Sequence, residues 1–540
     1  MRSRIVIIVS SFTLALALLV GLAPTGASSA SSRVTTGKSI SKLSIAVVAN
    51  AVDSADPAWG GSSLVLETTM PLLSYYPRVN GKVGALAPGL ATAIPKPTNH
   101  GMTYVFHLKP GIKYSNGQPV LASDFQYAIE RLYLANDYPI GKFYLIKGAA
   151  AFGKTRKGSI AGIIPDNASR TITFQLTAPM PTFDMLMAQY FTAPEPASTP
   201  AAAQDNQVPS TGPMMVTHFI ASQGYTLVKN PYFMPTAAMP ASNVNEIVAT
   251  VVSNPNVALS QTLNGTYNYD DENVAPDQLG TLLSKNASQT VTVALAATNM
   301  FSLNVTLKPF NDLRVRQAVN YAINRTAMAS LLGGLQLPTQ NILPPGETSF
   351  RKISAYPYNL AKAKSLVQAA HATGYKVTIL ASGDPTSEPE AVYLDNQLNA
   401  IGLNASVNIV PPSTFFGVPS NPKTDPQISW FPWNELIPDA SDWIGQLFNG
   451  QLINYSHNED WSMFNVASIN KQIATAEALP LGSARDAAWA ALDRALVVNY
   501  AAVVPYGNPV QVFVFSKSIN THCFTTFVGG EALLSNFCSK

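Results

Sequence analysis

In the stretch GMTYVFHLKPGIKYSNGQPVLASDFQYAIERL, residues 101–132, the spacing of the apolar residues changes once, from every second residue to the spacing of a helix. From Thr103 to Leu108 polar and apolar residues alternate, which predicts a half-buried β-strand. The pair Asn116-Gly117 then favours a tight turn. From Ser123, the predicted cap, apolar residues recur at helical spacing. The stretch therefore predicts a strand, a turn and a helix that pack together in an α/β fold.

This stretch resembles a segment of the family 5 extracellular solute-binding proteins, which deliver peptides, nickel complexes and some sugars to ABC importers. Further segments resemble the same family in the same order along the chain, namely 67–75, 210–233, 310–325 and 359–380. The resemblance implies an α/β fold with two lobes of the periplasmic-binding-protein type. Hinge crossovers join these lobes, and the first lobe carries an extra subdomain. The implied mechanism is hinge closure around a solute, without covalent chemistry.

The resemblance also implies a domain organisation. It predicts a signal peptide at 1–30, lobe I in three parts at 31–75, 205–297 and 505–540, an extra subdomain at 76–204, and lobe II at 298–504. Removal of the first 30 of the 540 residues leaves 510, which is too long for a single core.

The first 30 residues have the features of a secretory leader. Arg2 and Arg4 precede an apolar run from Ile5 to Leu22, and small residues follow as far as Ala30. An uncleaved membrane anchor stays open, because about 18 apolar residues are near the lower limit for spanning a bilayer. No cysteine stands at the cleavage site to receive a lipid. We expect an exported protein, in the periplasm or outside the cell, without a lipid anchor.

Composition supports an exported globular protein. Hydrophobic residues make up 47% of the chain and charged residues only 12%, which allows a large core. The formal charge of +3 falls to +1 when the leader's two arginines are lost, so no nucleic-acid partner is expected. We expect a monomer.

The two cysteines, Cys523 and Cys538, stand near the carboxyl end of the chain. In an oxidising compartment they are candidates for a disulfide, and two free buried thiols are the alternative. The sequence has no Cys-x-x-Cys spacing and no adjacent pair of histidines, so neither a metal nor a cofactor is expected.

Motifs for catalysis are missing from the sequence. There is no Gly-x-Ser-x-Gly and no His-Glu-x-x-His, so an enzyme is not expected. GAAAFGKT, residues 148–155, fits the phosphate-loop pattern letter for letter, but glycines and a proline follow within ten residues and would stop a helix. ATP binding is therefore not expected.

The strongest ligand signal lies between Trp430 and Trp443, where three of the six tryptophans fall. In the family, peptide-binding members use an Asp in this region to hold the α-ammonium group of the ligand, and Leu436 stands at that position here. Glu435 is a substitute only if the strand shifts by one residue, and alternation would then direct it to the opposite face. The predicted ligand-binding residues are Asn299, Met300, Trp430, Trp433, Asn434, Glu435, Leu436 and Tyr506.

The predicted function is that of an extracytoplasmic solute-binding protein of an ABC transporter. It captures a peptide or a similar solute between two lobes and delivers it to the permease subunits. Because the Asp is replaced, a non-peptide ligand such as an oligosaccharide or a nickel chelate stays open. A secreted interaction protein that reuses the fold is a further alternative.

Overall fold

A computed structural model describes residues 37–48, 51–59, 62–70, 72–76, 78–79, 82–135, 143–201, 208–271, 274–453, 458–527 and 530–540. By its internal contacts, the chain from residue 36 onward is one compact unit. The predicted signal peptide at 1–30 lies outside the described residues.

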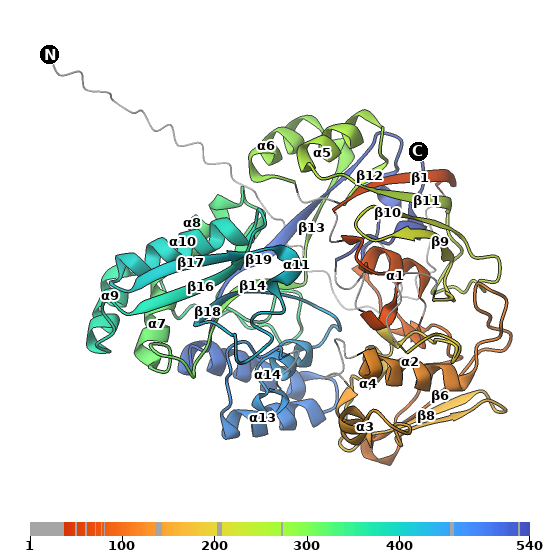
Figure 1. Cartoon of the computed structure of the whole chain (residues 1–540), viewed down its shortest axis with the longest axis horizontal. Coiled ribbons are helices and arrows are strands. Elements are labelled where there is room, and N and C mark those ends of the chain that lie inside the picture. The colour runs from red at the N-terminus through yellow and green to blue at the C-terminus, as the bar shows by residue number, and fades with distance from the viewer. Residues whose placement is uncertain are drawn as a thin grey trace. The chain divides into compact units, whose positions relative to one another are not determined.

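One mixed sheet runs through the described residues and contains 12 strands. Its strands are β1 (Ile40–Val47), β9 (Met214–Ile220), β10 (Gly224–Lys229), β11 (Val244–Val251), β12 (Tyr269–Asp270), β13 (Thr290–Ala294), β14 (Ala297–Leu303), β15 (Gln336–Pro338), β16 (Lys376–Ser382), β17 (Asn404–Val410), β18 (Ile428–Asn434) and β19 (Val503–Phe515). The strand order is β17-β16-β18-β14-β19-β12-β1-β11-β10-β9, and β13 and β15 also pair with β19. Figure 1 shows β16, β17 and β18 at one end of this series and β9, β10 and β11 at the other.

The long strand β19 joins the two lobes. Its first half, 503–509, pairs with β14 and β15, and its second half, 510–515, pairs with β12 and β13. The chain crosses a second time where β13 ends at Ala294 and β14 begins at Ala297. At this crossover Gly507 has no room for a Cβ atom, because the Gln336 side chain occupies the space. The two crossovers therefore bring the edges of both lobes close to each other.

Separate hydrophobic cores support the two-lobed fold. One core is built only from residues between Met300 and Tyr506. Another combines β1, β9, β10 and β11 with apolar residues of 513–537, where the chain returns to the first lobe. A third core surrounds a small sheet of the extra subdomain. The predicted residue boundaries between the domains stay predictions.

The small sheet contains the strand predicted from the opening stretch. It has the order β6 (Thr103–His107), β8 (Thr171–Gln175), β7 (Ile163–Asp166), with antiparallel pairing throughout. The helix α2 (Ala122–Ala135) packs Phe125, Ile129 and Leu132 into the same core as Tyr104 and Phe106. The predicted strand and helix are thus confirmed.

The predicted cap of α2 at Ser123 is wrong, because the helix begins one residue earlier, at Ala122. The backbone N–H of Ser123 donates instead to Asn167 Oδ1 over 3.0 Å. The carboxylate of Asp124 accepts from the backbone N–H of Leu121 at 2.9 Å and from the hydroxyl of Tyr114 at 2.8 Å. The carboxylate therefore ties the start of the helix to the preceding strand and turn.

The remaining strands are short pairs, β2 (Ser74–Tyr75) with β5 (Ala87–Pro88) and β3 (Arg78–Val79) with β4 (Lys82–Val83). The remaining helices are α1 (Ser63–Thr69), α3 (Ala149–Thr155), α4 (Phe183–Leu186), α5 (Pro255–Asn264), α6 (Pro276–Lys285), α7 (Leu313–Ala322), α8 (Arg325–Leu331), α9 (Leu360–Ala369), α10 (Ser387–Ala400), α11 (Pro412–Phe415), α12 (Ile444–Leu447), α13 (Ala467–Ala478) and α14 (Ser483–Arg494). Figure 1 shows α7, α8, α9 and α10 around β16 and β17, with α13 and α14 below them. None of the helices in the described ranges is both long and apolar enough to cross a membrane.

The segment that fits the phosphate-loop pattern is mostly helical. Lys154 lies inside α3, which begins directly after Gly148, so no loop precedes a helix N-terminus in the way that phosphate binding requires.

At the carboxyl end Cys523 and Cys538 form a disulfide with their Cα atoms 5.8 Å apart.

Candidate functional site

Three adjacent strands bring most of the predicted ligand-binding residues together. In β14 and β18, Thr298 is opposite Trp433, Asn299 opposite Pro432 and Phe301 opposite Trp430. In β14 and β19, Met300 is opposite Pro505. Residues about 130 to 205 positions apart in the sequence therefore lie side by side at the lobe crossover.

The aromatic residues of this group are held by a buried carboxyl group. The indole N–H of Trp430 donates to Glu390 Oε2 at 2.7 Å, and the Tyr506 hydroxyl donates to the same oxygen at 2.5 Å. Burial raises the pKa of Glu390 to about 8, although both hydrogen bonds lower it. Tyr506 has no exposed surface and its ring stacks on Phe301 with the ring centroids 4.9 Å apart. In this conformation Trp430 and Tyr506 are therefore part of the interior of lobe II.

The residues that follow β18 lie at the lobe boundary. Asn434 is exposed, Glu435 is buried, and the backbone N–H of Glu435 donates to the carbonyl of Ala296 at 2.9 Å. The backbone N–H of Leu436 donates to Asp442 Oδ2 at 2.8 Å, and its carbonyl accepts from the side-chain amide of Gln189. Because β18 ends at Asn434, strict alternation no longer sets the direction of the Glu435 side chain.

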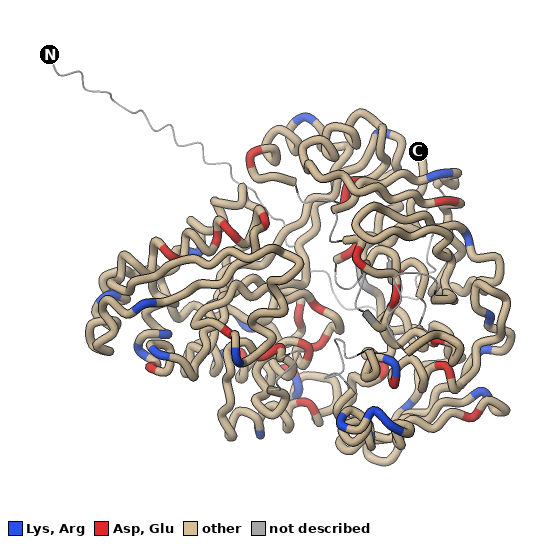
Figure 2. The backbone as a smooth tube through the Cα atoms, in the orientation of Figure 1, with Lys and Arg blue, Asp and Glu red and all other residues tan. Residues whose placement is uncertain are grey.

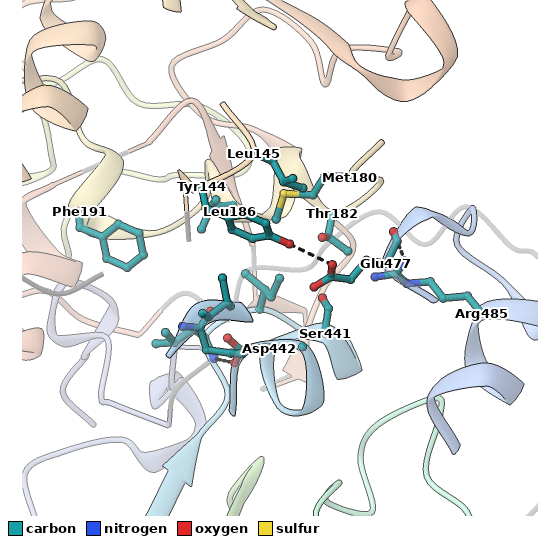
Figure 3. A pocket seen from close by; sticks show the side chains of 15 residues that line it. Tyr144, Leu145, Met180, Thr182, Leu186, Phe191, Ser441, Asp442, Glu477 and Arg485 are labelled. Atoms are coloured by element: carbon teal, nitrogen blue, oxygen red, sulfur yellow. Dashed lines mark hydrogen bonds between the residues drawn. The ribbon is translucent and has the colours of Figure 1, made fainter. Parts of the chain in front are cut away.

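A cleft lies between the extra subdomain and lobe II (Figure 3). Its first wall is formed by Tyr144, Leu145, Met180, Thr182, Leu186 and Phe191. Its second wall is formed by Leu436, Ile437, Ser441, Asp442, Gly445, Gln446, Leu452, Glu477 and Arg485. The walls touch, because the Tyr144 hydroxyl donates to Glu477 Oε2 at 3.0 Å. The free volume is about 40 Å³, enough for a few water molecules, so a larger solute requires the walls to separate.

Beside this cleft two carboxyl groups contact each other. Glu347 and Glu435 are 7% and 6% exposed, and a hydrogen bond joins their carboxyl groups. Burial raises the pKa of Glu347 well above its ordinary value, and the bond to Glu435 and the charges of Asp439 and Asp442 raise it further. A hydrogen bond between two carboxyl groups needs a proton on one of them, so the pair shares at least one proton.

A tyrosine from the first lobe faces this pair. Tyr76 is 4% exposed, and its hydroxyl has no hydrogen-bond partner among the described residues. Burial raises the pKa of the Tyr76 hydroxyl most. The charges of Asp184, Glu435, Asp439 and Glu347 raise it further. Burial also raises the pKa of Asp184 to about 6. The phenol thus lies among carboxyl groups from both lobes, with an unused donor and acceptor.

One cation lies close to this group, and its donors are already in use. The Arg485 guanidinium binds Asp439 through two hydrogen bonds of 2.8 and 2.7 Å, and it also donates to three backbone carbonyls. Burial raises the pKa of Glu477 to about 7, and the bond from Tyr144 and the charge of Arg485 oppose that shift. Figure 2 shows a group of acidic positions in the middle of the view, above α14 as labelled in Figure 1. The described residues of the site thus bring several carboxyl groups together, and the Arg485 guanidinium close to them is already bound to Asp439.

Sequence reasoning identified only part of this site. The local tryptophan group led to β18 and to Glu435, but Tyr76, Tyr144, Glu347 and Glu477 come from four distant segments with no shared motif. Only the tertiary fold brings them together. The predicted ligand contacts of Asn299, Met300, Trp430, Trp433, Asn434, Glu435, Leu436 and Tyr506 stay predictions.

Comparison with known proteins gives consistent relatives. Bacterial extracellular solute-binding proteins, family 5 Middle, match residues 85–454, which is more than half of the chain. The oligopeptide-binding protein OppA of Bacillus subtilis is 27% identical over 275 residues, which are 48% of this chain and 49% of OppA. The match thus spans about half the length of this curated relative.

Solved structures show the fold. A clavulanic acid biosynthesis oligopeptide-binding protein has a TM-score of 0.80 at 18% identity, covering 93% of this chain and 96% of the other. The periplasmic binding protein DppA of Helicobacter pylori, solved in complex with the peptide STSA, has a TM-score of 0.78 at 18% identity and covers 93% and 98%. The two-lobed architecture predicted from the sequence is confirmed, and the chain belongs to the bacterial extracellular solute-binding proteins of family 5, a family of non-enzymatic binding proteins.

Proposed function

We propose that this chain is the extracytoplasmic solute-binding component of an ABC importer. It captures a peptide, or a similar solute with a cationic amino group, between its lobes and presents the closed form to the permease subunits. The protein works outside the cytoplasm, without a lipid anchor. The single observation that carries the ligand class is the buried Glu347–Glu435 pair with the unpartnered hydroxyl of Tyr76.

Charge supports a cationic ligand group. With one proton shared between Glu347 and Glu435, the pair retains one negative charge, and the guanidinium of Arg485 nearby is already bound to Asp439. An ammonium group has three donors, which suit carboxylate and phenol oxygens. A charge-assisted hydrogen bond of this kind contributes roughly 1.5 to 3 kcal/mol. The acidic group thus takes over the task of the Asp that Leu436 replaces.

The apolar cleft wall supports a ligand that carries side chains. Leu145, Met180, Leu186 and Phe191 belong to the extra subdomain, and Ile437 faces them from lobe II. These groups match the apolar body of a peptide once the lobes open. The hydrogen bonds between the walls, including the bond from Tyr144 to Glu477, stabilise the closed form.

The two non-peptide ligands are less well supported. A sugar site needs an accessible indole face, but Trp430 is 9% exposed and its N–H is bound to Glu390. A nickel chelate favours histidine, and no histidine is among the described residues that line the cleft.

Native mass spectrometry with an equimolar peptide pool tests the proposal. One sample contains free N-termini, and a second contains the same peptides acetylated. We expect retained peptide masses from the free pool and binding weaker by about ten- to a hundredfold after acetylation.

We expect the substitution Glu435→Gln to weaken the binding of peptides with free N-termini and to leave the binding of acetylated peptides unchanged. The matched control is Glu388→Gln, because Glu388 is exposed at the start of α10. Equal binding of both pools, or retention of a single non-peptide mass, would contradict the proposed ligand class.

A further inference from the structure

Lobe II contains a second pair of buried acidic residues, far from Glu435 in the sequence. Asp425 is 7% exposed and Asp460 is 2% exposed. After burial itself, the charge of Asp460 is a cause of the raised pKa of Asp425, so the two carboxyl groups lie within electrostatic reach of each other. Neither forms an ion pair within the described residues. Two neighbouring buried acids thus lack a protein cation.

Each carboxyl group uses one oxygen and leaves the other without a partner. Asp425 Oδ2 accepts from the side-chain amide of Asn304 at 2.8 Å, and Asp425 Oδ1 has no partner in the described part of the chain. Asp460 Oδ1 accepts from the backbone N–H and the hydroxyl of Ser462 at 3.1 and 2.6 Å, and none of the described residues binds Asp460 Oδ2.

A neutral oxygen completes the set. Asn458 is 1% exposed, and its Nδ2 donates to the carbonyl of Asp460 at 2.7 Å, while its Oδ1 is bound by none of the residues that the structure describes. Buried polar atoms nearly always find a partner, and a bound ion is one of the few explanations for a group of them. Three orphaned oxygens therefore occur in one small network.

The loops that carry these oxygens are fixed to one another. The backbone N–H of Asn304 donates to the carbonyl of Gln427 at 3.0 Å, and that of Val305 donates to the carbonyl of Ser462 at 2.9 Å. The backbone N–H of Asn458 donates to the carbonyl of Ser420 at 2.9 Å. The segments near 304, 425 and 460 thus form one rigid unit, as a preformed ion site requires.

We propose that Asp425, Asp460 and Asn458 bind a calcium ion that stabilises lobe II. The three candidate donors are all oxygens, which suit a hard cation such as Ca²⁺ and disfavour zinc or copper. Two carboxylates neutralise its charge, and water molecules complete the coordination. The site has only two acids, and no group of three or more His, Cys, Asp or Glu in the described residues has a metal-binding arrangement, so it depends on the asparagine oxygen.

Metal analysis and thermal unfolding of the full protein test this site. After dialysis against EGTA and then CaCl2, we expect one Ca²⁺ per chain by mass spectrometry of the metal content. About 10 mM CaCl2 is expected to raise the unfolding midpoint by about 2 °C, and MgCl2 by less. Less than about a tenth of an ion per chain would overturn the proposal, as would an equal response to magnesium or none to calcium.

Two variants separate binding from ordinary structure. Asp425→Asn and Asp460→Asn should each lose the bound ion and the response to calcium, yet unfold in EGTA no more easily than the unaltered protein. The reason is that an amide removes one of two uncompensated buried charges. The control Asp277→Asn alters an exposed acid of α6 and should keep the response. Equal destabilisation of both variants with and without calcium would assign the two acids a structural role and contradict the site.

Discussion

Two groups of buried acidic residues in this molecule differ in the partners that their carboxyl groups bind. In the first lobe, Asp56 and Glu195 each bind Arg131 at 2.6 Å, and all three side chains have no exposed surface. At the cleft, Glu347 and Glu435 are nearly as buried, and their carboxyl groups bind each other. Similar burial therefore has opposite consequences. The first group stabilises the fold by itself, whereas the second supplies the negative charge that the proposed ligand would neutralise.

The internal triad ties distant segments together. Arg131 of α2 binds both oxygens of Asp56, one oxygen of Glu195 and the carbonyl of Pro200. These bonds raise the pKa of Arg131 above its ordinary value, although burial alone would lower it. Burial raises the pKa of Glu195 to about 8, and the charge of Arg131 opposes the rise. This group is consequently sensitive to loss of its single cation.

The largest expected effect comes from breaking the triad. Arg131→Met should lower the free energy of unfolding by about 3 to 5 kcal/mol, because two carboxyl groups remain buried without a cation. Urea denaturation measures the loss. Arg494→Met is the control, since Arg494 is exposed in the last turn of α14 and should change stability by less than about 0.5 kcal/mol. Similar losses of stability in both variants would mean that the buried triad contributes no more to the free energy of unfolding than an exposed arginine does.

The cleft should show its uncompensated charge as a dependence on pH. The pKa of Glu477 is raised from its ordinary value of 4.5 to about 7, so its protonated form is favoured by folding. The resulting stability is complete below about pH 4.5 and is lost as the pH rises to about 7. Over this range the unaltered protein should lose roughly 2 to 3 kcal/mol relative to Glu477→Gln. Denaturant titrations at several pH values measure the free energy of unfolding of both proteins. If both free energies change with pH in the same way, Glu477 does not carry the predicted charge effect.

A third buried carboxyl group shows an intermediate solution. Glu390 accepts from two neutral donors, Trp430 and Tyr506, and binds no cation among the described residues. Tyr506→Phe removes one of these donors and should cost about 1 to 2 kcal/mol of stability. Tyr358→Phe is the matched control, because Tyr358 is 46% exposed and should have almost no effect. Differential scanning calorimetry on both variants measures the unfolding midpoint. An unchanged midpoint in Tyr506→Phe would refute the predicted loss of stability.

The sequence predicted local elements well because their signals are local. The alternation from Thr103 to His107 became β6, and the apolar residues at helical spacing became α2. The cap of α2 was mistaken because Asn167, 44 positions further along the chain, binds the backbone of Ser123. A distant residue replaced the local partner.

The site was predicted only where the chain concentrates its signal. Tryptophans in β18 pointed to Glu435, but the alternation used to predict the direction of its side chain does not extend to it, because β18 ends one residue earlier. Glu347 lies in a segment without helix or strand periodicity, and Tyr76 follows a two-residue strand. Their proximity depends on how the lobes pack, which no spacing along the chain encodes.

The central claim is that the carboxyl pair at the cleft holds a cationic ligand group. The direct measurement is a calorimetric cycle with one bound peptide, free or acetylated at its N-terminus, on the unaltered protein and on Glu435→Gln. We expect acetylation to weaken binding to the unaltered protein at least tenfold more than binding to the variant, a coupling of about 1.4 kcal/mol. An equal effect of acetylation on both proteins would contradict the claim.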